Sequence, residues 1–277
     1  KAVTRKDVLE YHHKFFVPKN AVLMVVGRVD RAAFRKQAVQ LLGQPTVWSG
    51  EVPRFDHRNT TDKRLPKPKA GTVLVVDRPG LTQAEVRMGF KAPLVTAPEH
   101  YALAVANALL GEYFNSRLNL LIRDKLGLTY GITSAFAYNK DLAVFTIGAA
   151  TRNEAVGKLI GKTLDVLKDL KKGPIPADEV RMAKEYLVGG FPLSVSTLGS
   201  VAARWLSGYV FDLGTGYLNE FVPKVGAVTP EQVMAAVSKD IKPEQLIVVV
   251  AGDAAEIGKS LGEAGIPYVK ASVKQLL

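Results

Sequence analysis

The spacing of apolar and polar residues predicts several strands followed by a run of helices. Residues 84–90 alternate, with Val86, Met88 and Phe90 on one face, as expected for a half-buried strand. Other apolar runs bounded by turn residues also predict strands, with a hairpin turn at residues 139–141. These expected strands are residues 72–77, 130–138, 142–150 and 246–251.

Apolar residues at spacings of three and four predict helices in the same part of the chain. The expected helices are residues 98–110, 117–126, 154–170, 177–187, 197–211, 230–240 and a short one near 255–261. Ser116 and Thr229 occupy N-cap positions, and Gly127 is a stop signal. Strands, then helices, then a returning strand indicate an α+β fold with a mainly antiparallel sheet and helices packed on one face.

The two ends of the chain resemble each other at a constant offset of 225 residues. Residues 4–27 and 229–252 have identical Thr, Val, Lys, Pro and Gly at matched positions, without a gap. Each copy predicts a threonine N-cap, an amphipathic helix, a proline-containing turn and a buried strand that ends in glycine. A gapless match of this length indicates duplicated half-domains.

The repeat also predicts how the chain is divided. Residues 1–50 are expected to be the C-terminal tail of a first half-domain, and residues 51–70 a basic linker rich in Pro and Lys. Residues 71–277 are expected to form a complete second half-domain. If the two copies are equal in length, about 155 residues of the first are expected upstream of Lys1.

Composition narrows the classes of function. Of the 277 residues, 47% are hydrophobic and 23% charged, which is typical of a globular protein and argues against disorder. The apolar runs are far shorter than the roughly 20 residues of a membrane span. The chain has no cysteine, which excludes disulfides, thiolate metal sites and a thiol nucleophile.

The net charge of +11 is concentrated at one end of the chain. Residues 1–70 hold 15 Lys and Arg against 6 Asp and Glu, whereas residues 71–277 hold 22 against 20. Nucleic-acid surfaces interleave basic and aromatic residues, and only Phe55 and His57 fit that pattern here. We therefore interpret the basic stretch as a solvated linker and expect no nucleic-acid partner.

The four histidines do not form a zinc-binding motif. Such a helix carries two histidines on one face together with a glutamate. His12 and His13 are adjacent and project about 100° apart on a helix, and Pro98 interrupts the segment before His100. We expect no metal site and no metal cofactor in this chain.

Residues 114–131, FNSRLNLLIRDKLGLTYG, carry the clearest motif. They resemble the C-terminal half of the pitrilysin/insulinase-type zinc peptidases, in which an N-S-R-L helix precedes R-x-K-x-G-L-x-Y. The resemblance continues through residues 190–194 and 229–252, and also covers residues 1–27, so that it extends over nearly the whole chain.

The resemblance implies that this chain is the zinc-free, substrate-binding half or partner subunit of a zinc metalloendopeptidase. It also implies that the chain is not catalytically competent alone. It implies that Arg123 and Tyr130 are the catalytic and substrate-binding pair, donating to a peptide carbonyl, with Asn115 as a further candidate for substrate binding. The resemblance also implies that the substrate is a peptide or an unfolded protein. It implies that the zinc is bound by the other half or by a catalytic subunit, in a heterodimer or a homodimer. Finally, it implies a periplasmic location.

Two alternatives stand beside this interpretation. A basic residue in the last turn of a helix, such as Arg123, stabilises the helix dipole whatever its function, and a tyrosine that opens a strand, such as Tyr130, commonly belongs to the core. The whole chain could also be a non-catalytic scaffold, like the family's core subunits in a respiratory complex. Retention of both Arg123 and Tyr130 favours the substrate-binding interpretation.

Overall fold

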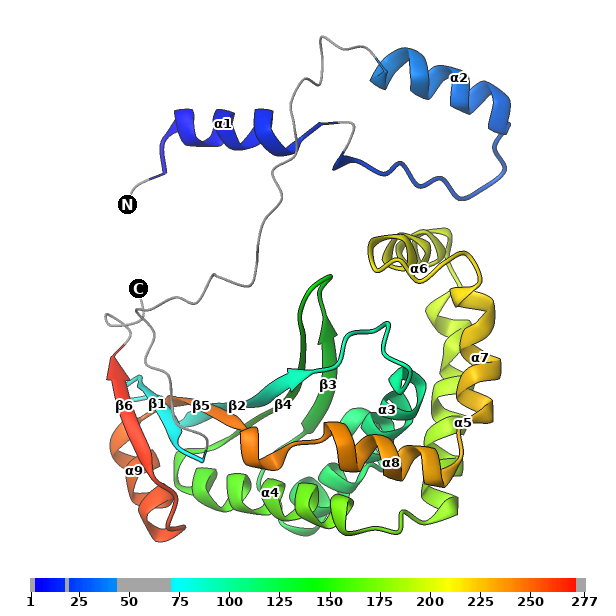
Figure 1. The fold of residues 1–277 in the computed structure, drawn as a ribbon. Helices are drawn as coiled ribbons and strands as arrows, with labels where there is room; N and C mark the ends of the chain where they lie inside the picture. The colour runs from blue at the N-terminus through cyan, green and yellow to red at the C-terminus, as the bar shows by residue number, and fades with distance from the viewer. Residues whose placement is uncertain (1–2, 18–19, 44–70, 273–277) are drawn as a thin grey trace. The chain divides into compact units, whose positions relative to one another are not determined.

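The computed structural model describes residues 3–17, 20–43 and 71–272 (Figure 1). The chain falls into two compact units. The sheet unit comprises Asp62–Pro192 and Asn219–Leu277, and the N-terminal unit comprises Lys1–Thr61 and Leu193–Leu218. The expected linker at residues 51–70 lies outside the described residues, so the division into tail, linker and half-domain stays a prediction.

A six-stranded sheet with the order β3-β4-β2-β5-β1-β6 forms the centre of the sheet unit. Its antiparallel pairs are β3 with β4, β4 with β2, and β2 with β5, while β5 with β1 and β1 with β6 are parallel. The predicted mainly antiparallel sheet is thus confirmed. The strands are β1 Val73–Asp77, β2 Gln83–Ala92, β3 Ile132–Tyr138, β4 Ala143–Arg152, β5 Ile247–Gly252 and β6 Tyr268–Ser272.

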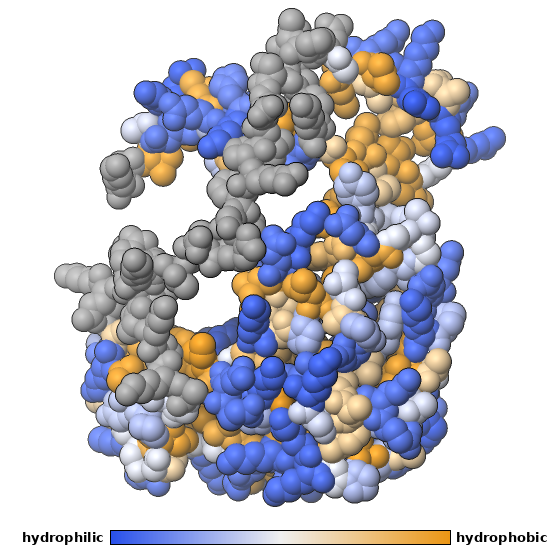
Figure 2. Space-filling model, in the orientation of Figure 1, coloured by the Kyte–Doolittle hydropathy of each residue, from blue (hydrophilic) through white to orange (hydrophobic). Residues whose placement is uncertain are grey.

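Helices cover one face of this sheet, as the sequence predicts. Buried and more exposed residues alternate along β2 and β4, so that one face of each strand is in the core. The covering helices lie below the sheet in Figure 1 and are α3 His100–Asn107, α4 Val156–Lys172, α8 Pro230–Asp240 and α9 Ala254–Glu263. The outward side of α4 carries exposed charged residues such as Lys158 and Asp165. The lower part of Figure 2 shows large blue areas between paler and orange ones.

The remaining helical segments of the sheet unit include two π-helical stretches. The segments are the π-helices Ala108–Glu112 and Asn119–Lys125, the 3-10 turns Asn153–Ala155 and Pro243–Gln245, α5 Ala177–Ser194, and α7 Tyr217–Ala227, which begins at the unit boundary. α7 was not predicted from the sequence, because its internal Pro223 is a helix-breaker signal. β6 was not predicted either; it is a short strand whose partner among the described strands is β1.

The capping expected at Thr229 is present. Its hydroxyl accepts from the backbone N–H of Gln232, and the Gln232 side chain accepts from the backbone N–H of Thr229 at 3.0 Å. This capping box satisfies two backbone donors that the first turn of α8 would otherwise leave unpaired. The second copy of the repeat therefore begins and ends as predicted, from Thr229 to the strand β5.

In the N-terminal unit, the first copy of the repeat matches only in its helix. Thr4 and Asp7 form the same reciprocal cap on α1, Arg5–Phe15. The strand predicted at residues 21–26 is wrong: this segment is extended but in no sheet, and Val22, Leu23 and Val25 are exposed. Its counterpart β5 hydrogen-bonds to β1 and β2, whereas residues 21–26 have no neighbouring strand among the described residues. A strand needs such a partner for its backbone groups.

Two further helices of the N-terminal unit are α2, Arg31–Leu42, and α6, Leu198–Val210. α2 was not predicted, although Asp30 caps it by accepting from the first backbone N–H groups. Several apolar side chains of α6 are exposed, and Figure 2 shows orange surface in that part of the view. Among the described residues no single helix is long and apolar enough to cross a membrane, although α5 and α6 would reach that length and composition together.

Candidate functional site

Arg123 and Tyr130 lie on either side of one helix-to-strand corner. The helix ends at Leu126, whose backbone N–H donates back to carbonyls of the last turn. Gly127 then takes φ of +60°, the left-handed conformation that glycine adopts without strain. The predicted glycine stop is therefore present, but β3 begins at Ile132, so that Tyr130 lies on the turn before the strand.

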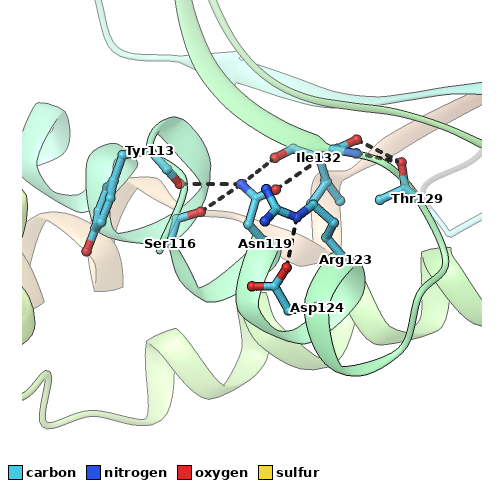
Figure 3. A network of polar contacts seen from close by, with 8 residues as sticks. Tyr113, Ser116, Asn119, Arg123, Asp124, Thr129 and Ile132 are labelled. Atoms are coloured by element: carbon cyan, nitrogen blue, oxygen red, sulfur yellow. Dashed lines mark hydrogen bonds and ion pairs between the residues drawn. The ribbon is translucent and has the colours of Figure 1, made fainter.

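A buried asparagine joins the two sides of this corner. Asn119 is 6% exposed, and its Nδ2 donates to the carbonyl of Ile132 at 2.9 Å and to Ser116 Oγ at 3.1 Å. Its Oδ1 accepts from the backbone N–H of Ile132 at 3.3 Å. Because β3 is an edge strand, this amide pairs with its first residue as a neighbouring strand would (Figure 3). Asn119 thereby links the helix that carries Arg123 to the turn that carries Tyr130.

The guanidinium group of Arg123 is held in place by two neighbours. Its Nε donates to Asp124 Oδ1 at 2.8 Å (Figure 3), and its central carbon lies 3.5 Å from the centroid of the Phe114 ring. The Arg123 side chain is 20% exposed, so one part of it remains open to solvent. A guanidinium group stacked on a ring and bonded through Nε presents its terminal amino groups in a restricted set of directions.

Hydrogen bonds of the neighbouring residues, and not contacts of its ring, fix the position of Tyr130. The adjacent Thr129 hydroxyl donates to the carbonyl of Ala150 at 2.6 Å, and the Thr151 hydroxyl donates to the carbonyl of Leu128 at 2.5 Å. These bonds attach the turn to the end of β4. The Tyr130 residue itself is 96% exposed, so the interpretation that places it in the core is wrong. Its hydroxyl is therefore available to a ligand.

Arg123 and Tyr130 line the same solvent-open pocket, which has a volume of about 580 Å³. The pocket lies entirely within the sheet unit and is lined by Gln83, Arg123, Asp124, Gly127, Leu128, Thr129, Tyr130, Ala150, Thr151 and Arg152. Asn115, the third candidate, is exposed on the loop before the helix and is not among these described lining residues. The structure thus brings Arg123 and Tyr130 together and leaves Asn115 apart, and the role of all three in substrate binding stays a prediction.

No prediction from the sequence covered Asn119 and Phe114, which support the pair, or Arg152, which lines the pocket beside it. Asn119 interrupts an otherwise apolar helix face between the buried Leu118 and Ile122, and a polar residue at such a position signals a specific buried partner. Phe114 and Arg152 gave no comparable signal, because their contacts join segments that are separate in the sequence. Only the tertiary structure identifies them.

Desolvation shifts the pKa values of His100 and Glu112, two acid–base groups of the sheet unit. Burial lowers the pKa of His100 to about 4, and the Tyr138 hydroxyl lies 3.3 Å from its Nδ1. Desolvation raises the pKa of Glu112, although the hydrogen bond that Asn107 donates at 2.8 Å opposes this shift. Neither group is among the described residues that line the pocket of Arg123 and Tyr130. His100 is 9% exposed, whereas Glu112 is an exposed residue whose carboxyl group is partly desolvated. The burial of His100 favours a structural role.

The described residues offer no group of three or more histidine, aspartate or glutamate side chains that could hold a metal ion. A zinc site needs three or four such ligands at about 2 Å from the ion. The donor set of this part of the chain therefore does not fit zinc.

Comparison with known proteins identifies relatives of this fold and motif. Residues 2–187 match the family described as the peptidase M16 inactive domain. An uncharacterised zinc protease of Mycobacterium bovis is 27% identical over 209 residues, which are 73% of this chain and 45% of that protein. The chain thus spans about half the length of the curated relatives that it matches.

Solved structures share the fold. The peptidase M16 inactive domain from Pseudomonas fluorescens superposes with a TM-score of 0.77 at 24% identity, covering 91% of this chain and 58% of that one. A chain of complex III2 from Candida albicans, bound to Inz-5, superposes with a TM-score of 0.73 at 15% identity, covering 96% of this chain and 63% of that one. The family match extends over more than half of the chain and confirms the resemblance drawn from residues 114–131. The chain belongs to the peptidase M16 inactive-domain family.

Proposed function

We propose that this chain is the substrate-binding, zinc-free half or partner subunit of an M16 zinc peptidase. Arg123 and Tyr130 would contact the peptide, with the catalytic zinc on another half-domain or on a separate subunit. The observation that carries the proposal is that both side chains line one open pocket while hydrogen bonds fix the backbone around them. The inactive-domain family of the chain supports a non-catalytic half.

The two side chains suit the recognition of a peptide carbonyl. Arg123 offers N–H donors and a positive charge, and Tyr130 offers a single O–H donor. Donors aimed at a carbonyl oxygen stabilise it most when it becomes an oxyanion, because negative charge then accumulates on that oxygen. The hydrogen bonds between Asn119 and Ile132 would keep Arg123 and Tyr130 at a constant separation, so that little reorganisation of the protein accompanies binding.

The arrangement of the complete enzyme is part of the same proposal. A heterodimer with a zinc-bearing subunit follows from the pairing known in the family, and a second half-domain within one polypeptide or a homodimer are the other arrangements. A periplasmic location, which the family resemblance implies, belongs to the proposal. Fractionation of source cells, followed by purification of the protein with its partners, tests both points: a cytoplasmic protein without any M16 companion would contradict them.

The activity test uses the enzyme assembled with its zinc-bearing half or partner. Tyr130→Phe should lower turnover more than tenfold, since loss of one oxyanion donor costs on the order of 10²–10³ in well-studied enzymes. Its stability should change by less than about 0.5 kcal/mol, because the ring is exposed. Arg123→Lys should lower turnover as well, because lysine cannot stack on Phe114 or bond through Nε.

Two exposed residues provide matched controls. Tyr209→Phe removes a hydroxyl from an exposed tyrosine on α6, and Arg181→Lys alters a surface arginine on α5 that pairs with Glu185. Both control variants should keep full activity. If Tyr130→Phe and Arg123→Lys also keep full activity, the substrate-binding role is refuted.

A scaffold is the second candidate function. It is supported by the similarity in fold to a chain of complex III2 from Candida albicans. A scaffold would hold partners together without contacting a peptide, so its assembly would survive the loss of both Arg123 and Tyr130. Full activity of both variants, together with loss of an assembly when the chain is removed, would favour this function over the first.

A further inference from the structure

The pocket that contains Arg123 and Tyr130 holds a second guanidinium group. Arg152 ends β4, and its register partner Gln83 begins β2, so both side chains reach the pocket from the sheet. Arg123 reaches it from the helix on the other side of the corner. Two arginines from different elements therefore line a single pocket of about 580 Å³.

Each arginine pairs with an acid through Nε. Arg123 Nε lies 2.8 Å from Asp124 Oδ1, and Arg152 Nε lies 2.9 Å from Glu154 Oε1. A guanidinium group has five N–H donors, so one bond through Nε leaves the two terminal amino groups, whose paired donors match a carboxylate. Both arginines thus retain the part of the side chain that recognises anions.

The distribution of charge favours an anion site beside Arg152 over one beside Arg123. Asp124 itself lines the pocket, so its negative charge accompanies Arg123 there. Glu154 is not among the described lining residues, although its carboxylate lies 2.9 Å from Arg152 Nε. The side chains of Arg152 and Glu154 are 66% and 63% exposed, and such exposed pairs are weak. An incoming carboxylate can therefore replace Glu154 at small cost.

We infer that this pocket binds a carboxylate of the peptide substrate and that Arg152 is the residue that determines this specificity. The inference rests on the proposed peptide-binding role of Arg123 and Tyr130. Arg123 and Tyr130 would hold the peptide backbone, while the more exposed Arg152 side chain would bind an acidic group beside it. The carboxylate is either an Asp or Glu side chain or the free C-terminus of a short peptide.

The test uses the assembled enzyme and pairs of peptide substrates that differ at one position, with Glu in one peptide and Gln in the other. Successive pairs move this position along the peptide. At one position the wild-type enzyme should cleave the Glu peptide about tenfold more efficiently, as kcat/KM, at low salt, and the preference should fall as salt screens it. A parallel pair with a free or an amidated C-terminus distinguishes the two sources of carboxylate.

Two variants assign the preference to Arg152. Arg152→Gln should reduce the ratio of kcat/KM for Glu and Gln peptides to about one, and Arg152→Glu should reverse it. Arg87→Gln is the matched control, because Arg87 also lies on a strand, pairs with a glutamate two residues away at 2.5 Å, and is outside the pocket. This control should leave the ratio unchanged.

The outcomes separate this inference from the proposed function. If Tyr130→Phe lowers turnover of both peptides but Arg152→Gln leaves the Glu preference intact, the specificity inference is wrong and the proposed function stands. If no position shows a preference for a carboxylate in either peptide series, the inference is also wrong. If neither the Arg123 and Tyr130 variants nor the Arg152 variants change anything, both fail together.

Discussion

Replacement of Asn119 by alanine tests the central structural element of the site. Asn119 is 6% exposed, and its amide pairs with both backbone groups of Ile132, a residue with no exposed surface. Alanine would leave that N–H and that C=O without a partner at the edge of the sheet. Each buried backbone group that loses its hydrogen bond costs about 1–3 kcal/mol, so for two groups we expect a loss of about 2–6 kcal/mol in the free energy of unfolding.

Urea unfolding of the full chain, followed by far-ultraviolet circular dichroism, measures this loss. An unchanged m value would show that the comparison reports stability and not a change in the surface exposed on unfolding. Asn115→Ala is the matched control, because the same side chain is removed from an exposed position four residues away. It should change stability by less than about 0.5 kcal/mol. If Asn119→Ala lowers the free energy of unfolding by less than about 1 kcal/mol, or by no more than the control does, the stabilising role of the Asn119–Ile132 hydrogen bonds is refuted.

Asn119→Asp provides a second readout that cavity formation alone would not produce. The aspartate retains an acceptor for the Ile132 N–H but, when ionised, cannot donate to the Ile132 carbonyl. Protonation restores a donor, so this variant should recover part of its lost stability, relative to the wild type at the same pH, as the pH falls from 7 to 4. A loss that does not depend on pH would contradict the hydrogen-bonded arrangement.

Two further predictions concern His100 and zinc. Burial lowers the folded-state pKa of His100 from 6.5 to about 4, so the unfolded chain binds more protons between these values. The contribution of neutral His100 to the free energy of unfolding should be fully present above pH 6.5 and should fall by roughly 2 kcal/mol by pH 5. The His100→Gln variant should lack this fall when its unfolding is measured at pH 7.5 and at pH 5. The chain alone should bind no stoichiometric zinc and cleave no peptide; elemental analysis that finds one tightly held zinc per chain, lost on mutation of native residues, would overturn this expectation.

Local sequence signals predicted the elements whose causes are themselves local. The alternation along β2, the hairpin between β3 and β4, and the capping box at Thr229 each depend on residues within a few positions of one another. The family resemblance of residues 114–131 likewise needed no structure. The prediction failed where the cause is distant: residues 21–26 have the composition of a strand but no partner strand in the described part of the chain.

The candidate site shows the same division. The sequence by itself identified Arg123 and Tyr130 from a motif and placed them at a helix-to-strand corner. Only the tertiary structure decided that Tyr130 is exposed, that Asn119 joins the helix to β3, and that Arg152 from β4 shares their pocket. The physical reason is that a hydrogen bond to an edge strand, or a second charge in a pocket, depends on which segments the sheet order brings together. That order is set by packing of the whole core, and a short motif contains no information about it.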